Sequence, residues 1–162
     1  MPQIPIVDEE DNIIGYKERG EILWEDIYRV ASLWVTNSQG EVLLARRAYT
    51  KAHSPGVWGP AVAGTVEVGE SYDSNIVKEA KEELGIEGVE FTLDEHKRTT
   101  GNHNYFSQSY KVVLDWPIDK FRPQLEEVAE VKWFDLESLR LELQNNPDSF
   151  LKGIHKRYGI NS

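Results

Sequence analysis

The chain of 162 residues contains no cysteine. This absence excludes disulfide bonds, thiol catalysis and cysteine-ligated zinc. Basic and apolar runs are also missing from the first twelve residues, so no signal peptide is visible. No segment approaches the roughly 20 apolar residues of a membrane span. We therefore expect a cytoplasmic protein that does not have a membrane as its partner.

Positive charge is scarce as well. Lysine and arginine number 18 against 28 aspartate and glutamate residues, which gives a formal net charge of -10. This balance argues against nucleic acid or an anionic membrane surface as the main partner. A small phosphorylated ligand remains open, because bound cations can invert the local field.

The composition is that of a globular protein, with 40% hydrophobic residues, five tryptophans and seven tyrosines. The length suits one domain. We expect a single domain over residues 1–162, in which residues 1–28 form an N-terminal hairpin and a link and residues 29–162 form the core.

Periodicity and turn residues predict a mixed α+β fold with several strands, a central helix and a C-terminal helix. The N-terminal hairpin is expected over residues 4–17, around the turn DEEDN. Further strands are expected at 29–36, 41–47, 61–66, 89–100, 106–116 and 131–135. Helices are expected at 71–85, 136–146 and 149–159, and the Pro and Gly content of residues 51–60 predicts a loop.

The segment GTVEVGESYDSNIVKEAKEELGI, residues 64–86, concentrates the chemistry. On a helix, Glu79, Glu82 and Glu83 fall within an arc of about 100°. Two such charges about 5 Å apart repel by roughly 3 kcal/mol at an effective dielectric constant near 20. If partly buried, the cluster needs protonation or divalent cations, and oxygen ligands select Mg²⁺, Mn²⁺ or Ca²⁺. The alternative is a solvated helix face.

The same segment resembles the sequence motif of the Nudix family, in which glycines and glutamates stand at fixed spacings. Every glycine and glutamate of that motif is in register here, at Gly64, Glu70, Glu79, Glu82, Glu83 and Gly85. Lys78 departs from it, because the family has an arginine there and lysine keeps the charge without the planar fork. The resemblance implies an α/β/α sandwich with a mixed sheet, the motif helix in the centre and a C-terminal helix.

The resemblance also implies a function: metal-dependent hydrolysis of a pyrophosphate bond in a nucleoside diphosphate derivative or a related diphosphate. The implied cofactor is Mg²⁺ or Mn²⁺. The implied metal ligands are Glu79, Glu82 and Glu83, with the Gly64 carbonyl as a helper, and Lys78 belongs to the catalytic set. Glu70 is expected to orient the start of the helix and not to bind metal directly.

Several roles stay open from the sequence. The general base is Glu79, Glu126 or Glu127, with His103 as a weaker candidate. We expect one of Arg46 and Arg47 to face the pocket and bind phosphate, joined by Lys51. Trp58 and Tyr105 are candidates for stacking on a substrate ring.

The flanking sequence resembles a subgroup of the family related to isopentenyl-diphosphate isomerase. In those isomerases a cysteine and a histidine flank the first glycine of the motif, whereas Ala63 and Thr65 stand there in this chain. Because the acid of an isomerase is missing, hydrolysis is favoured. A diphosphate-binding module with little turnover is the alternative that Lys78 leaves open. The group attached to the diphosphate, the number of metal ions and the choice between monomer and homodimer also stay open.

Overall fold

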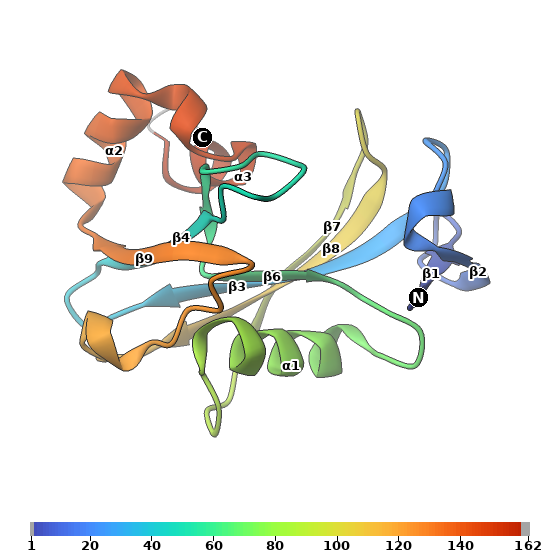
Figure 1. Cartoon of the computed structure of the whole chain (residues 1–162), viewed down its shortest axis with the longest axis horizontal. Coiled ribbons are helices and arrows are strands. Elements are labelled where there is room, and N and C mark those ends of the chain that lie inside the picture. The colour runs from blue at the N-terminus through green and yellow to red at the C-terminus, as the bar shows by residue number, and fades with distance from the viewer. Residues whose placement is uncertain (1, 160–162) are drawn as a thin grey trace.

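The computed structural model describes residues 2–159. The strands and helices follow one another along the chain as shown in Figure 1. The strands are β1 (Gln3–Val7), β2 (Ile13–Glu18), β3 (Tyr28–Thr36), β4 (Val42–Arg47), β5 (Trp58–Pro60), β6 (Val62–Thr65), β7 (Thr92–Thr99), β8 (Tyr105–Val113) and β9 (Val128–Phe134). The helices are α1 (Tyr72–Leu84), α2 (Leu136–Asn145) and α3 (Lys152–Tyr158), with short 3₁₀ turns at Arg19–Glu21, Ile118–Lys120 and Pro147–Ser149.

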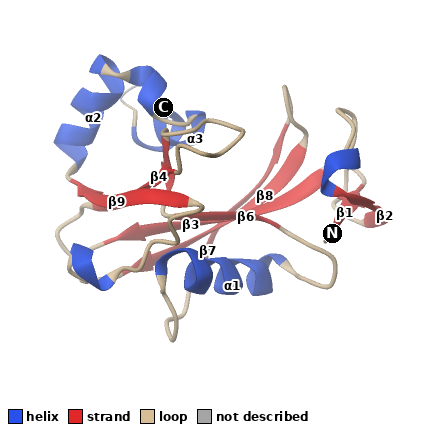
Figure 2. Ribbon diagram, in the orientation of Figure 1, coloured by secondary structure: helices blue, strands red, loops and turns tan. Residues whose placement is uncertain are grey.

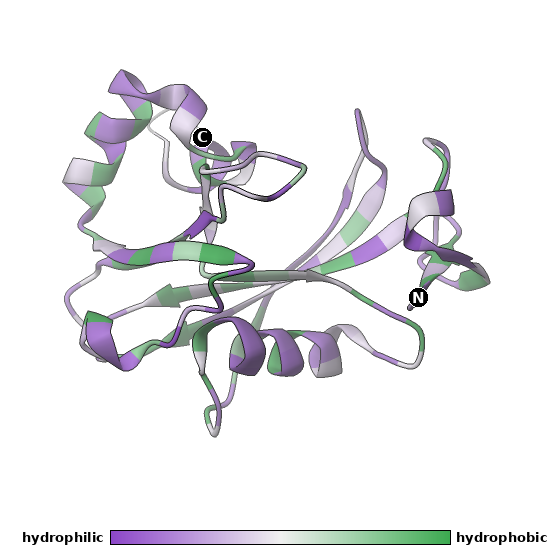
Figure 3. Cartoon of the chain, viewed as in Figure 1, coloured by the Kyte–Doolittle hydropathy of each residue, from purple (hydrophilic) through white to green (hydrophobic). Residues whose placement is uncertain are grey.

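Helices cover both faces of a seven-stranded mixed sheet, with α1 on one face and α2 and α3 on the other (Figures 1 and 2). The apolar residues Ile76, Ala80 and Leu84 of α1 are buried in the core that α1 shares with the sheet. The side of α1 turned to the viewer in Figure 3 is largely hydrophilic. This amphipathic helix on a mixed sheet confirms the predicted α/β/α sandwich.

The ends of α1 are set by local sequence, as predicted. Ser71 caps its start, because the Ser71 hydroxyl oxygen accepts a hydrogen bond from the Ser74 amide at 3.0 Å while the Ser74 hydroxyl oxygen accepts one from the Ser71 amide at 2.9 Å. Gly85 ends the helix in the left-handed conformation, with φ 71°. Glycine adopts this conformation at little steric cost.

The seven-stranded sheet opens between two of its strands. β3 pairs with β4 only at Val35 and Thr36, while residues 30–33 of β3 pair with β6. β4 in turn pairs with β5 through residues 44–46. Residues 58–65 therefore cross from β4 to β3 and separate these two strands. This separation makes room for a cavity.

Two predicted boundaries were wrong in this part of the chain. The loop expected over residues 51–60 ends early, because Trp58–Pro60 forms β5. β9 begins at Val128, three residues before the expected start at Val131. In both cases pairing with β4 imposes the strand conformation. The local Gly and Pro content does not report such long-range pairing.

The N-terminal hairpin is confirmed, and β1 and β2 form a two-stranded sheet separate from the larger one. It lies at one end of the molecule (Figure 1). The Val7 amide donates to the Ile27 carbonyl at 2.9 Å, and Val7, Ile27 and Phe106 form a small apolar cluster. Within residues 2–159, no helix has the length and apolar character required to cross a bilayer.

Candidate active site

A cavity of about 590 Å³ occupies the gap between β4 and β3. One wall is acidic and comes from α1 and the segment before β9, with Glu79, Glu82, Glu83 and Glu127. The opposite wall is basic and comes from β4 and the loop after it, with Arg46, Arg47 and Lys51. A cavity with these two walls suits a ligand that carries phosphate groups and bound cations.

The acidic wall depends on a close approach between β6 and α1 at Gly64. A Cβ atom placed on Gly64 would lie 2.6 Å from Cγ of Glu79 and 2.9 Å from its Cδ. Any residue larger than glycine would therefore push the Glu79 side chain from its position. The first glycine of the motif has a physical role here, which is to let the helix carboxylates reach the cavity.

Glu79 and Glu83 form a carboxyl pair. Glu83 is only 8% exposed. The pKa of Glu83 is raised to about 9, mainly by burial. A hydrogen bond to Glu79 and the negative charges of Glu79 and Glu127 act in the same direction. Lys51 opposes this shift. Glu79 and Glu127 are thus close enough to Glu83 for their charges to disfavour its ionised form.

Glu82 is exposed and lines the edge of the cavity. Within residues 2–159, no group of three or more acidic or histidine side chains is arranged to hold a metal ion. Of the predicted triad, the structure thus brings Glu79 and Glu83 into contact and leaves Glu82 beside them. The hard oxygen donors of this wall match the ligand preference of Mg²⁺ and Mn²⁺.

Lys78 lies behind the acidic wall and forms ion pairs with three carboxylates. Its Nζ atom is 2.6 Å from Glu70, 3.3 Å from Glu67 and 3.5 Å from Glu79. Burial by itself would lower the pKa of Lys78, but the hydrogen bonds that its ammonium donates to Glu70 and Glu67 raise this pKa well above its ordinary value. Lys78 is therefore a permanent cation that holds the acidic side chains in place.

Glu70 takes the orienting position that the sequence predicts. Its Oε1 atom accepts hydrogen bonds from the Glu67 amide at 2.8 Å and from Nδ2 of Asn75 at 3.0 Å. Burial would raise the pKa of Glu70, but the hydrogen bonds from Lys78, the Glu67 amide and Asn75 lower it. Glu70 thus joins the loop before α1 to the first turns of the helix.

Both arginines of the basic wall line the cavity, where one was expected. Arg46 donates from Nε to the Gly56 carbonyl at 3.0 Å, and its Nη1 is 3.2 Å from Oε1 of Glu130. Arg47 donates from Nε to the His53 carbonyl at 3.0 Å. Lys51 forms a close ion pair with Glu127. Both guanidinium groups retain N–H donors that can bind a phosphate.

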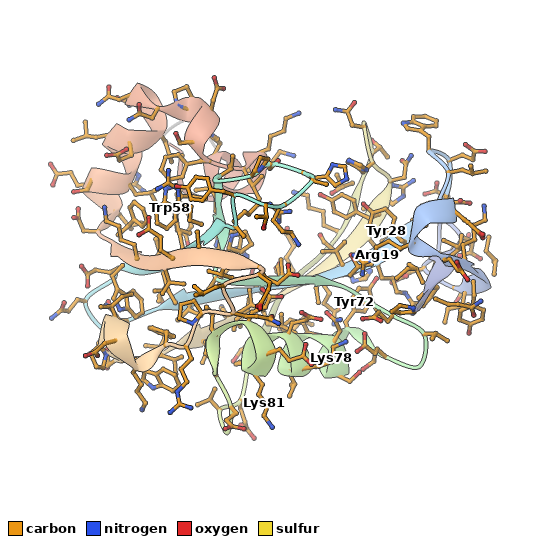
Figure 4. All side chains as sticks on the ribbon, viewed as in Figure 1. Arg19, Tyr28, Trp58, Tyr72, Lys78 and Lys81 are labelled. Atoms are coloured by element: carbon orange, nitrogen blue, oxygen red, sulfur yellow. The ribbon has the colours of Figure 1, made fainter. Side chains whose placement is uncertain are left out.

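Trp58 was predicted to contact the substrate, but it is 8% exposed and is not among the residues that line the cavity. Its ring packs edge to face on Phe134, with ring centroids 5.1 Å apart, in the core below α2 and α3 (Figure 4). The pairing of β5 with β4 turns the ring to that face of the sheet. Tyr105 packs against Tyr28, with centroids 5.7 Å apart, and does not line the cavity either.

The candidate general bases lie at different distances from the cavity. Glu127 lines the cavity, whereas Glu126 is exposed and does not. His103 lies in the loop between β7 and β8, where its ring is 6.1 Å from that of His53. Sequence reasoning missed Arg19, which also lines the cavity. No local pattern marks Arg19, because its approach to the cavity follows from the placement of the N-terminal hairpin.

The profile of the NUDIX domain matches residues 27–153, which is most of the chain. The chain belongs to the Nudix family. It is 33% identical over 130 residues to an uncharacterized Nudix hydrolase of Streptomyces coelicolor, covering 78% of this chain and 70% of that one. It is also 30% identical over 149 residues to isopentenyl-diphosphate Delta-isomerase 2 of Photorhabdus laumondii, covering 90% and 84% of the two chains.

The fold of this Nudix chain is also found in a solved structure. The crystal structure of DR0079 from Deinococcus radiodurans superimposes with a TM-score of 0.74 at 23% identity, covering 89% of this chain and 90% of that one. At this identity the likeness supports the fold. Family membership and the hydrolase names among the relatives support a Nudix pyrophosphohydrolase, while the isomerase names match the subgroup that the flanking sequence resembles.

Proposed function

We propose that this Nudix chain hydrolyses the pyrophosphate bond of a nucleoside diphosphate derivative or a related diphosphate, with Mg²⁺ or Mn²⁺ as cofactor. The observation that carries this proposal is the cavity itself, which is lined by a carboxyl pair on α1 and by two arginines and a lysine on β4 and the loop after it. Such opposed walls bind the cations and the phosphate oxygens of one ligand from two sides.

The basic wall binds the diphosphate. Arg46 and Arg47 each use Nε on a backbone carbonyl, which fixes the guanidinium plane, and each retains further N–H groups for phosphate oxygens. Lys51 adds a third positive charge beside Glu127. These cations orient the phosphorus atom that water attacks and neutralise charge on the phosphate oxygens as the transition state forms.

The acidic wall holds the metal. Glu79, Glu82 and Glu83 would hold the cation, with the Gly64 carbonyl as a helper, and when bound it would neutralise phosphate charge and make water easier to deprotonate. Lys78 keeps Glu79 in position from behind. The bond from the leaving phosphate oxygen to phosphorus breaks as the water oxygen bonds to phosphorus, giving two phosphate products.

Glu127 is the candidate that takes the proton from the attacking water. It lines the cavity, in contrast to Glu126, and its charge acts on the nearby Glu83. The nearby Lys51 holds its carboxylate through an ion pair. Both properties support Glu127 over Glu126 as the proton acceptor.

Isomerisation is disfavoured by the residues around Gly64. Ala63 and Thr65 both line the cavity. Neither a methyl group nor a threonine hydroxyl can protonate a carbon–carbon double bond as an acid. The residues that this part of the cavity offers therefore support hydrolysis.

The test is a panel of nucleoside diphosphate derivatives and other diphosphates, assayed with Mg²⁺ and with Mn²⁺ for release of phosphate or a monophosphate. Glu83→Gln is expected to lower kcat at least about 100-fold, since charge stabilisation in the transition state is lost. Glu87→Gln is the matched control, because Glu87 is exposed, does not line the cavity and pairs at 3.5 Å with the exposed Lys81.

Equal rates for native protein and Glu83→Gln would refute the proposal. The chain would instead be a binding module if neither the native protein nor Lys78→Arg turned over a substrate and a diphosphate bound with micromolar affinity. Proton exchange into isopentenyl diphosphate would identify an isomerase.

A further inference from the structure

The turn between β1 and β2 places one carboxylate at a junction of four elements. Asp11 in this turn accepts a hydrogen bond from Nε of Arg29 on β3 at 2.7 Å and from the hydroxyl of Tyr72 on α1 at 2.8 Å. Nε2 of His96 on β7 lies 3.2 Å from the same carboxylate. The Asp11 side chain is only 15% exposed. This carboxylate thus links the N-terminal hairpin to three parts of the core.

Asp11 is not needed to close its own turn. Asp8 does this, because its Oδ1 atom accepts from the amides of Glu10 at 2.9 Å and Asn12 at 3.0 Å. Asp11 also has a left-handed backbone, with φ 64°, which glycine adopts at lower cost. An aspartate at this position is therefore explained by the contacts of its side chain and not by the shape of the turn.

The hairpin that Asp11 anchors leads directly into a residue that lines the cavity. Arg19 directly follows β2 and lines the cavity. Within residues 2–159 it makes no ion pair or hydrogen bond, and its positive charge acts on the Tyr28 hydroxyl. Figure 4 shows Arg19 and Tyr28 where the hairpin meets the sheet. A cation without a protein partner at a cavity wall is available to an anionic ligand.

A two-stranded hairpin has little stability of its own, so its position depends on how it is attached. Other attachments include the small cluster of Val7, Ile27 and Phe106, two backbone hydrogen bonds, an ion pair between Lys17 and Asp26, and an exposed ion pair between Glu9 and Arg98. The backbone hydrogen bonds join Val7 to Ile27 and Val68 to Gln3. Asp11 adds a polar contact that reaches three separate elements of the core, through Arg29, Tyr72 and His96.

We infer that Asp11 is a positioning residue, which holds the N-terminal hairpin so that Arg19 faces the active-site cavity and binds an anionic group of the substrate. The inference rests on the proposed function for the identity of that substrate as a diphosphate. The hairpin thus contributes to substrate affinity. It has no role in the chemical step, because Asp11 itself does not line the cavity.

The experiment compares native protein with Asp11→Gly, Asp11→Asn, Arg19→Ala and the double variant Asp11→Gly/Arg19→Ala. Glycine suits the left-handed backbone, so Asp11→Gly removes the side chain without straining the turn. We expect Asp11→Gly and Arg19→Ala each to raise KM about tenfold with kcat within twofold, because a charge-assisted hydrogen bond is lost. The double variant should show no further rise, because both changes remove the same interaction.

Two measurements do not depend on turnover. The dissociation constant of inorganic pyrophosphate, measured by calorimetry with each variant, should rise in parallel with KM. Amide hydrogen exchange of residues 3–18 should become faster in Asp11→Gly and not in Glu10→Ala, whose side chain is exposed on the same turn. Asp11→Asn keeps an acceptor oxygen and loses the charge, so it should fall between native protein and Asp11→Gly.

An unchanged KM and an unchanged pyrophosphate affinity in Asp11→Gly would overturn the inference. It would also be overturned if Arg19→Ala had no effect, or if the effects in the double variant were additive. If the native protein hydrolyses no member of the panel, the proposed function is wrong. The pyrophosphate affinity and the hydrogen-exchange rates would still test the role of Asp11 independently. Circular dichroism establishes that each variant is folded before it is compared.

Discussion

The replacement Gly64→Ala tests whether the close contact between β6 and α1 is needed for activity. The added Cβ would lie 2.6 Å from Cγ of Glu79, whereas ordinary van der Waals contact begins near 3.4 Å. The Glu79 side chain must therefore retreat by most of an ångström. A misplacement of about 1 Å in a catalytic site lowers the rate roughly 100-fold.

The effect on stability should be much smaller. Replacement of glycine by alanine stabilises by about 0.4–1 kcal/mol through the unfolded chain, while overpacking costs about 1–3 kcal/mol. The net loss is then no more than roughly 2.5 kcal/mol, which lowers Tm by less than about 10 °C in a chain of this size. Activity and stability thus separate in Gly64→Ala.

The assay measures kcat by phosphate release and Tm by thermal unfolding under the same conditions. Gly153→Ala serves as the control, because no atom lies within 4 Å of a Cβ placed there. A folded Gly64→Ala protein with a kcat within threefold of native would refute the reasoning. It would mean that the position of the Glu79 carboxylate does not limit the reaction.

Two further predictions concern charge pairs away from the phosphate-binding wall. Lys78→Met should lower Tm by about 2–6 °C, since the removed ammonium pairs with three carboxylates, whereas the exposed Lys81→Met should change Tm by less than about 1 °C. Asp94 pairs with Arg157 of α3 at 2.8 Å, and this hydrogen bond holds the pKa of Asp94 below its ordinary value of 3.8. The stabilisation is therefore present above about pH 4 and is lost as pH falls through the lower, folded-state pKa. Asp94→Asn should lower Tm by about 2–4 °C at pH 7 and by progressively less towards pH 3, and a constant difference over this range would contradict the assignment.

The motif helix was predictable because its signals are local. Ser71 and Gly85 set its ends through contacts with residues a few positions away. The spacing of Glu79, Glu82 and Glu83 places their carboxylates on one side of any helix that forms there. Local geometry of this kind does not change with the rest of the fold, which is why the acidic wall followed from the sequence.

The position of Trp58 could not be predicted from local sequence. Its sequence neighbours indicated a loop beside the site, yet pairing with β4 made it part of a strand and turned its ring into the core. Nothing in the residues next to Trp58 reports its partner strand. The face that a strand residue occupies depends on the register of pairing, and a change of one residue in register reverses that face.

Local pattern was enough to predict a capped helix with a row of carboxylates, and the resemblance to the Nudix motif added the expectation of divalent cations and a diphosphate. It was not enough to say which cations would stand opposite. Arg19, Arg46 and Lys51 reach one cavity because a hairpin, a strand and a loop converge there. Such convergence depends on contacts between residues far apart in the chain, whose partners are selected when the whole core packs and not by the neighbours of each residue.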